Sequence, residues 1–144
     1  MSITFSYLNK GISNKISNKK MIKQWIKYII KLYDREVGDI SYYFTNDDEI
    51  IDINKKYLNH NYFTDIITFD YCDNKQISGD IVISLDTVKT NSEVFNTNFY
   101  DEILRVIIHG IFHLLGYKDK SEDEKLLMRQ KENEALKIFY DKWN

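Results

Sequence analysis

The stretch YDEILRVIIHGIFHLLGY, residues 100–117, is the most apolar segment of the 144-residue chain and has the spacing of a helix. A helix that is hydrophobic on most of its surface is buried, because it cannot present a broad face to water. We therefore expect it to lie at the centre of the fold. Gly116 is well placed to end the helix in a left-handed turn, so that the chain doubles back after it.

The sequence on both sides of this helix predicts strands as well as helices. Alternating or β-rich apolar segments predict the strands, and apolar side chains at helical spacing predict the helices. The expected strands are 3–8, 40–44, 65–69 and 80–84, and the expected helices are 19–37, about 46–57, 86–97, 100–117 and one opened by the capping box at Ser121. The polar loop between 65–69 and 80–84 is typical of a hairpin or a sheet edge.

These elements predict an α+β fold in which residues 1–144 form a single domain. A small mixed β-sheet of about four strands would be packed with four or five helices. The single cysteine, Cys72, fits a reducing compartment, and no run of apolar residues exceeds three, so neither a membrane span nor a signal peptide is expected. We therefore expect a soluble cytoplasmic protein that does not associate with a membrane.

Charge is distributed unevenly along the chain, although the net charge is only −2. Residues 1–37 carry a charge of +6 and residues 38–144 carry −8, counted from the Lys, Arg, Asp and Glu of each segment. Lys19, Lys23, Lys27 and Lys31 recur every four residues and share one helix face. This face is either plainly solvated or turned toward the phosphates of a nucleic acid.

The quoted segment also carries two histidines at the spacing of metal ligands. His109 and His113 are four residues apart, so their imidazoles point the same way. After Gly116, the next side chain able to complete a metal site is Asp119. Two histidines and one carboxylate leave a fourth position open, as in catalytic zinc sites. The alternative is that the two histidines are satisfied separately; the third, His60, is either a surface residue or a substrate contact.

Gly110 stands where a zinc peptidase would have its catalytic glutamate, which makes a metallopeptidase unlikely. A glycine inside a helix costs roughly 0.5–1 kcal/mol relative to alanine, so the space it leaves should be needed. Close approach of a substrate or of another backbone segment would explain the glycine, and so would tight packing of the helix. Without a carboxylate at this position, the metal must itself lower the pKa of its water toward about 7.

The pattern H-G-x-x-H-L-x-G-Y at 109–117 resembles the signature of the YbeY family, bacterial rRNA maturation factors described as single-strand-specific metallo-endoribonucleases. Other segments are similar to further family blocks: Asn54 and Tyr57, TDIITF (64–69), GDIVIS (79–84), Glu102 and Met128. The resemblance covers about half of the chain. It implies a mixed sheet with helices and an exposed metal cleft at the end of the central helix.

The chain departs from the family pattern at three positions. Asp119 replaces the usual third histidine, Leu58 replaces an arginine, and Phe63 replaces a proline. The absent arginine puts phosphate binding and nuclease turnover in question. Asp65 is a candidate proton acceptor if its strand lies beside the metal helix, or else a residue that braces the strand. No catalytic general base is assigned.

The resemblance therefore implies a zinc-dependent endoribonuclease that acts in rRNA processing, including maturation of the small-subunit rRNA 3′ end, and in ribosome quality control. One Zn²⁺ per chain, or another divalent transition metal, would be held by His109, His113 and Asp119. The expected partners are rRNA, the ribosomal subunit and ribosomal or assembly proteins. The alternatives are a non-catalytic, metal-binding ribosome-assembly factor and, less favoured, a metallopeptidase.

Overall fold

The computed structural model describes residues 2–9, 11–12, 16–58 and 64–143, so His60 and Phe63 lie outside the described residues. Its elements follow one another as β1 (Ile3–Tyr7), α1 (Lys19–Leu32), β2 (Glu36–Thr45), α2 (Asp47–Leu58), β3 (Ile66–Asp70), β4 (Gln76–Ser84), α3 (Leu85–Val94), α4 (Phe99–Leu114) and α5 (Glu122–Lys142). Four strands and five helices in the described ranges confirm the predicted α+β class.

The strands form one mixed sheet in the order β1-β2-β4-β3. β1, β2 and β4 are parallel, whereas β3 runs antiparallel to β4 and pairs Ile66 with Ile83. The loop between 65–69 and 80–84, for which the sequence predicted a hairpin or a sheet edge, therefore closes a hairpin. Within the described part of the chain, β1 and β3 are the two edges of this sheet.

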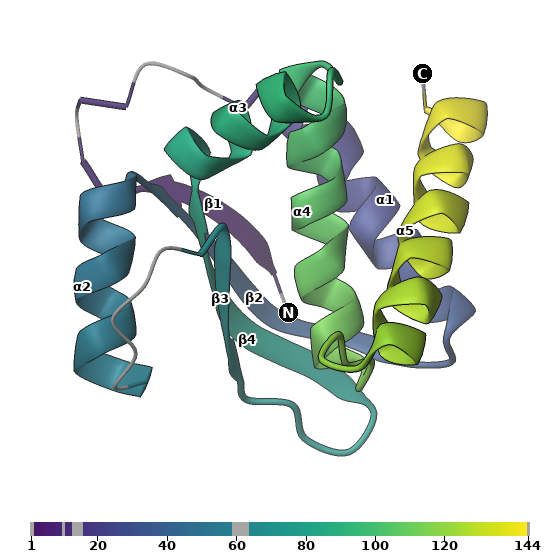
Figure 1. The fold of residues 1–144 in the computed structure, drawn as a ribbon. Helices are drawn as coiled ribbons and strands as arrows, with labels where there is room; N and C mark the ends of the chain where they lie inside the picture. Colours follow the sequence, from purple (N-terminus) through teal and green to yellow (C-terminus); the bar gives the residue numbers. More distant parts are fainter. Residues whose placement is uncertain (1, 10, 13–15, 59–63, 144) are drawn as a thin grey trace.

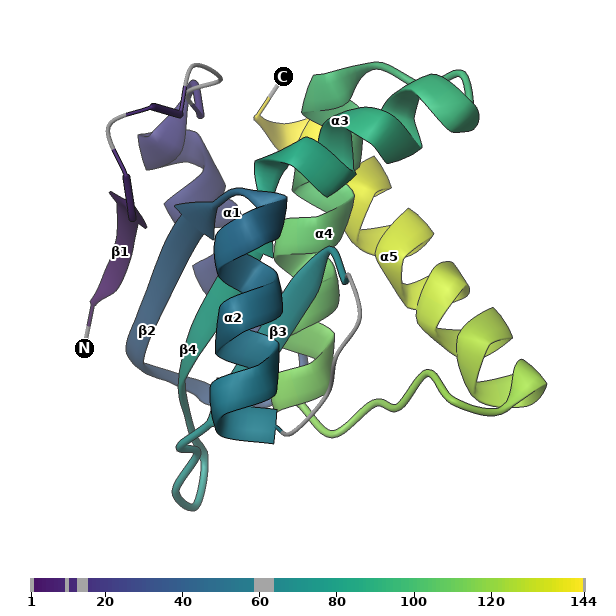
Figure 2. The same cartoon turned by 60° about the vertical axis from the view of Figure 1, so that its left-hand side comes forward.

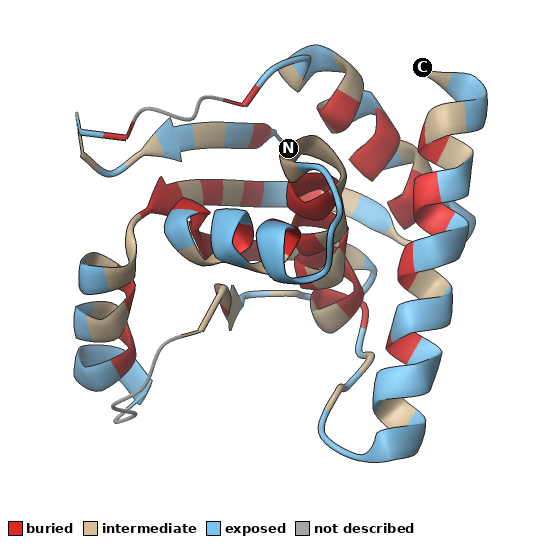
Figure 3. Ribbon diagram, turned by 45° about the horizontal axis from the view of Figure 1, so that its top comes forward, coloured by how far each residue is buried: buried red, intermediate tan, exposed pale blue. Residues whose placement is uncertain are grey.

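Helices cover the two faces of the sheet unequally (Figures 1 and 2). α2 lies on one face, where Ile50 packs with Ile67 and Val82 in a small apolar cluster. α1, α4 and α5 lie on the other side, and their buried faces form the main core. Figure 3 shows this burial as red bands along the helices. Trp25 and Phe139 meet in that core at a ring-centroid distance of 5.1 Å.

α4 is the central helix, as the sequence predicts. It contacts α1, α3, α5, β3 and β4. Its backbone also helps to satisfy a buried polar group, because Tyr42 donates a hydrogen bond to the Ile107 carbonyl over 2.9 Å. None of the helices in the described ranges is both long enough and apolar enough to cross a bilayer.

The predicted end of the first helix, at residue 37, is wrong. α1 stops at Leu32 and β2 already begins at Glu36. Asp34 has a φ of 59°, a left-handed conformation that ends the helix and turns the chain toward the sheet. Gly38, which resembled a helix end, lies inside β2.

Gly110 is explained by packing of α4 against the sheet. A Cβ atom built at this residue would lie 3.1 Å from the Cδ1 atoms of both Ile66 and Ile81. These residues belong to β3 and β4, so the glycine lets the helix approach two strands closely. Gly110 is buried, and helix packing is thus the better of the two explanations offered by the sequence.

Candidate metal centre

The last turns of α4 and the loop after it bring the three predicted ligands together. Gly116 has a φ of 105° and follows the end of the helix. Its N–H donates to the His113 carbonyl, and the Tyr117 N–H donates to the Phe112 carbonyl, which is the hydrogen-bond pattern of a Schellman motif. This turn reverses the chain and returns Asp119 to the side of α4 that carries the histidines.

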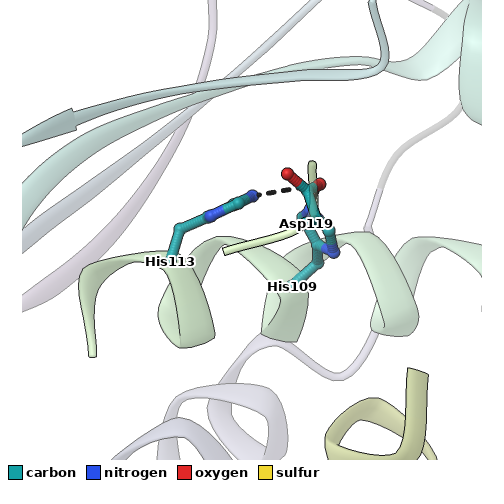
Figure 4. A group of neighbouring side chains, drawn as sticks. All are labelled: His109, His113 and Asp119. Carbon is teal, nitrogen blue, oxygen red and sulfur yellow. Dashed lines mark ion pairs between the residues drawn. The ribbon is translucent and has the colours of Figure 1, made fainter. Parts of the chain in front are cut away.

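The candidate ligand atoms converge in a small volume (Figure 4). Asp119 Oδ2 lies 3.2 Å from His109 Nε2 and 3.4 Å from His113 Nε2. One ligand atom from each residue lies within 4.8 Å of the others, so the group could hold a metal ion. Two imidazole nitrogens and one carboxylate oxygen suit zinc and related divalent transition metals.

The outer nitrogens of both imidazoles have their own partners. His109 Nδ1 lies 2.6 Å from Glu132 Oε2, and His113 Nδ1 lies 3.1 Å from the Tyr117 carbonyl oxygen. With its proton on Nδ1, each histidine donates to that oxygen and turns the lone pair of Nε2 toward Asp119. Such partners fix the tautomer and the ring orientation of metal-binding histidines, so the geometry fits a metal site.

Glu132 is buried, and two neighbouring side chains favour the ionised form of its carboxyl group. Burial by itself would raise its pKa, but hydrogen bonds from His109 and Arg105 outweigh burial and hold the pKa below its usual value. Arg105 Nη1 lies 2.9 Å from Glu132 Oε1, so the carboxylate bridges the arginine and the histidine. A buried carboxylate held in this way orients His109, and it would make the imidazole a stronger ligand for a metal ion.

The two histidines differ in their affinity for protons. Burial would lower the pKa of His109, but the hydrogen bond and charge of Glu132, followed by the charge of Asp119, raise it above its ordinary value. Burial, followed by the nearby charge of His109, lowers the pKa of His113. His113 is therefore the member of the pair that stays neutral more readily and is ready to act as a ligand.

Asp65 is a candidate proton acceptor on the condition that its strand lies beside the helix with the two histidines. β3, which begins directly after Asp65, does contact α4. Burial raises the pKa of its carboxyl group, although the charge of His109 opposes this effect. Its backbone carbonyl accepts a hydrogen bond from the Ser84 N–H over 2.9 Å, which braces the start of the β3–β4 pair. The residue thus combines a structural backbone contact with a carboxyl group beside the candidate site.

Sequence reasoning missed Glu132 and Arg105. Glu132 lies 23 residues beyond His109, and its partnership with that histidine depends on how α5 packs against α4. One signal was available: Glu132 shares the helical spacing of Met128, Ala135 and Phe139, all of which are buried. A glutamate on an apolar helix face requires a partner, because an unpaired buried charge is costly.

The remaining predicted residues lie apart from this cluster. Leu58 is the last residue of α2 and is 40% exposed. Lys19 and Lys23 lie over the rings of Tyr7 and Phe5, with Nζ-to-centroid distances of 5.0 and 5.5 Å. Those rings belong to β1, at the opposite edge of the sheet from β3. The row of lysines does not surround the candidate metal centre.

The chain is similar to known proteins both in sequence and in fold. The family model described as "Endoribonuclease YbeY" matches residues 7–140. A protein from Bacteroides fragilis named endoribonuclease YbeY is 48% identical over 94% of this chain and 96% of its own length. One of the same name from Parabacteroides distasonis is 46% identical over 95% and 96%. The solution structure of TM1509 from Thermotoga maritima, at 24% identity, matches with a TM-score of 0.67 over 99% of this chain and 91% of that one, which supports the fold.

Proposed function

This chain belongs to the endoribonuclease YbeY family, and we propose on that premise that it is a zinc-dependent endoribonuclease specific for single-stranded RNA. It would act in the cytoplasm on rRNA within a ribosomal subunit, in processing that includes small-subunit 3′-end maturation, and in ribosome quality control. Ribosomal or assembly proteins would be further partners. The observation that carries the proposal is the convergence of His109, His113 and Asp119 on one point.

The proposed ligands are the Nε2 atoms of the two histidines and one carboxylate oxygen of Asp119. When bound there, a divalent cation supplies Lewis acidity toward a phosphoryl oxygen and toward water. Glu132 and the Tyr117 carbonyl hold the two imidazoles in the tautomer that this binding needs. Asp65 is the residue we propose to accept a proton, because its raised pKa brings its carboxyl group closer to the range of a general base.

A second candidate is a metal-binding ribosome-assembly factor without turnover. Leu58, in place of the family arginine, is the observation that favours it. A metallopeptidase is disfavoured because Gly110 supplies no carboxylate and is buried against the sheet. The two leading candidates share the metal centre and differ in whether the centre cleaves RNA.

Parallel measurements of metal content and RNA cleavage distinguish these candidates. Wild type, His109→Ala and Lys137→Gln would be purified side by side, since Lys137 is exposed and pairs only with Asp141 in the described structure. We expect wild type and Lys137→Gln to contain zinc and to cleave a defined single-stranded RNA, and His109→Ala to do neither. Metal without cleavage in the wild type would favour the assembly factor. Equal cleavage by all three would indicate a contaminating nuclease and would remove the support for the proposal.

A further inference from the structure

A second feature lies directly beside the candidate metal centre. An open cavity of about 210 Å³ is bounded by Asp65, which directly precedes β3, by residues at the end of α3, and by residues of α4 and α5. His109 and Glu132 form part of its wall, so the cavity lies against one of the three candidate metal ligands. Its other lining residues include Phe95, Asn91 and Arg129, which none of the steps above uses.

The two arginines of this cavity differ in their contacts and in their exposure to solvent. Arg105 donates to Glu132 over 2.9 Å and to Asn133 over 2.8 Å, and its side chain is 19% exposed. Arg129 is 59% exposed, and in the described part of the chain the contact recorded for its guanidinium is a 3.8 Å ion pair with Glu132. The guanidinium of Arg105 is therefore occupied by contacts within the protein. The guanidinium of Arg129 can direct its N–H donors toward a ligand.

Three carboxylates line the cavity. Glu132 forms the 3.8 Å ion pair with Arg129, whereas Asp65 and Glu102 form no ion pair with it in the described part of the chain. Glu132 already accepts hydrogen bonds from Arg105 and lies against His109. Glu102 is buried and accepts a hydrogen bond from the Thr97 hydroxyl over 3.4 Å. Of the two arginines that line the cavity, Arg129 is therefore the more accessible, and its guanidinium suits an anionic group such as a phosphate.

Phe95 supplies a different kind of surface at the same cavity. It caps the C-terminal end of α3 and is 64% exposed. The buried side chains of Leu85 and Val88 fix α3 against the rest of the fold. An exposed aromatic ring needs no explanation when it stands alone. This ring lines a cavity that also holds the exposed guanidinium of Arg129 and a candidate metal ligand, a combination that suits a nucleotide.

We propose that this cavity is a nucleotide subsite for single-stranded RNA, in which Phe95 stacks on a base and Arg129 pairs with a backbone phosphate. The inference rests on the proposed endoribonuclease function and names the groups that bind the strand next to the metal centre. Bases of a single strand are free to stack on an aromatic side chain, whereas those of a duplex are already stacked on one another. The family pattern has an arginine where this chain has Leu58, which carries no charge. Arg129 supplies a positive charge from a different part of the chain.

The test measures binding separately from cleavage. A fluorescein-labelled, single-stranded RNA with 2′-O-methyl sugars would be titrated with the metal-loaded protein at several salt concentrations, and a gel would confirm that the strand stays intact. The variants are Phe95→Ala, Phe95→Tyr, Arg129→Gln and Arg129→Lys. The matched controls are Val94→Ala, which alters the exposed apolar neighbour, and Lys137→Gln, which removes one positive charge from another part of α5.

Substitutions at Phe95 and at Arg129 should weaken RNA binding in different ways. Phe95→Ala should weaken binding of the single strand by roughly 5- to 100-fold without changing the salt dependence, and Phe95→Tyr should retain binding. Arg129→Gln should weaken binding and flatten the salt slope by about 0.7, the contribution of one phosphate contact to a single strand, whereas Arg129→Lys should keep most of that slope. Binding of a duplex of the same sequence should not respond to Phe95→Ala.

The outcome that overturns the inference is binding by Phe95→Ala and Arg129→Gln that equals binding by the two control variants. If the wild type still cleaves RNA in that case, the proposed function stands and only the subsite is wrong. A wild type that neither binds nor cleaves the single strand would overturn both. Because both side chains are exposed, thermal unfolding should show that all variants remain folded.

Discussion

Two helices of this protein carry charged or ligating side chains at the same four-residue spacing, with very different results. On α4, His109 and His113 meet Asp119 from the following loop and Glu132 from α5. On α1, Lys19 and Lys23 lie over aromatic rings of β1, whereas Lys27 and Lys31 are exposed.

The difference shows what a helical repeat can and cannot determine. A four-residue spacing puts side chains on one face, whatever the residues are. The chemistry of that face depends on the groups that the rest of the fold sets against it. Carboxylates face the histidines, so the histidines form a candidate metal centre, whereas the lysines line an outer face of the molecule. The following variants test this contrast.

The largest effect is expected from removing the histidine pair. His109→Ala/His113→Ala should reduce metal content to background and abolish cleavage, because only the Asp119 carboxylate of the three proposed ligands remains. Lys19→Gln/Lys23→Gln, the same kind of double change on α1, should keep the metal. Elemental analysis of both purified proteins makes the comparison, and near-stoichiometric zinc in the histidine double mutant would contradict the assignment.

The third ligand should be nearly as important. Asp119→Ala should lose most of the metal, whereas Asp119→His should keep it. A carboxylate gives more negative charge to a cation than a neutral imidazole does, so Asp119→His should make the bound cation a stronger Lewis acid. The rising limb of the pH–rate profile should then move to lower pH. A move to higher pH, or full metal retention in Asp119→Ala, would exclude Asp119 as a ligand.

Glu132→Gln should have an intermediate effect, because the carboxylate acts on the metal through His109. Loss of such a partner typically weakens metal affinity by about 10- to 100-fold. Glu132 raises the pKa of His109, so the metal-free variant should show a lower pKa for that imidazole in an NMR titration. Glu134→Gln, which alters an exposed residue on the same helix, is the control. Equal affinity and an unchanged His109 pKa in the two variants would reduce Glu132 to a packing role.

The smallest effect is expected from the lysine row. Replacing Lys19, Lys23, Lys27 and Lys31 by glutamine should weaken RNA binding uniformly across sequences, with the salt slope flattened by about 0.7 for each phosphate contact that is lost. The position of Lys19 and Lys23 at the far edge of the sheet keeps the expected number of contacts low. Titrations over a range of salt concentrations measure the slope. If it does not change, the row is only a solvated face.

The sequence by itself determined most of the local structure. Local sequence patterns indicated each of the nine elements that the described residues form, and the capping box at Ser121 begins α5 as predicted. The spacing of His109 and His113, with the turn at Gly116, was enough to select Asp119 as their partner. Each of these features depends on residues close together in the chain, where backbone geometry fixes which side chains share a face.

Tertiary structure alone decided where α1 ends, why Gly110 is needed and which side chains surround His109. α1 ends at Leu32 rather than near Gly38, because the chain turns at Asp34 and β2 extends back to Glu36, which pairs with Gln76 of β4. Gly110 is needed because α4 packs closely on Ile66 and Ile81. Glu132 reaches His109, and Arg129 lines the same cavity, only because α5 packs alongside α4, the helix that carries Arg105 and His109. Helical spacing fixes direction within one helix, whereas contacts between distant segments depend on how those helices dock, which no local pattern specifies.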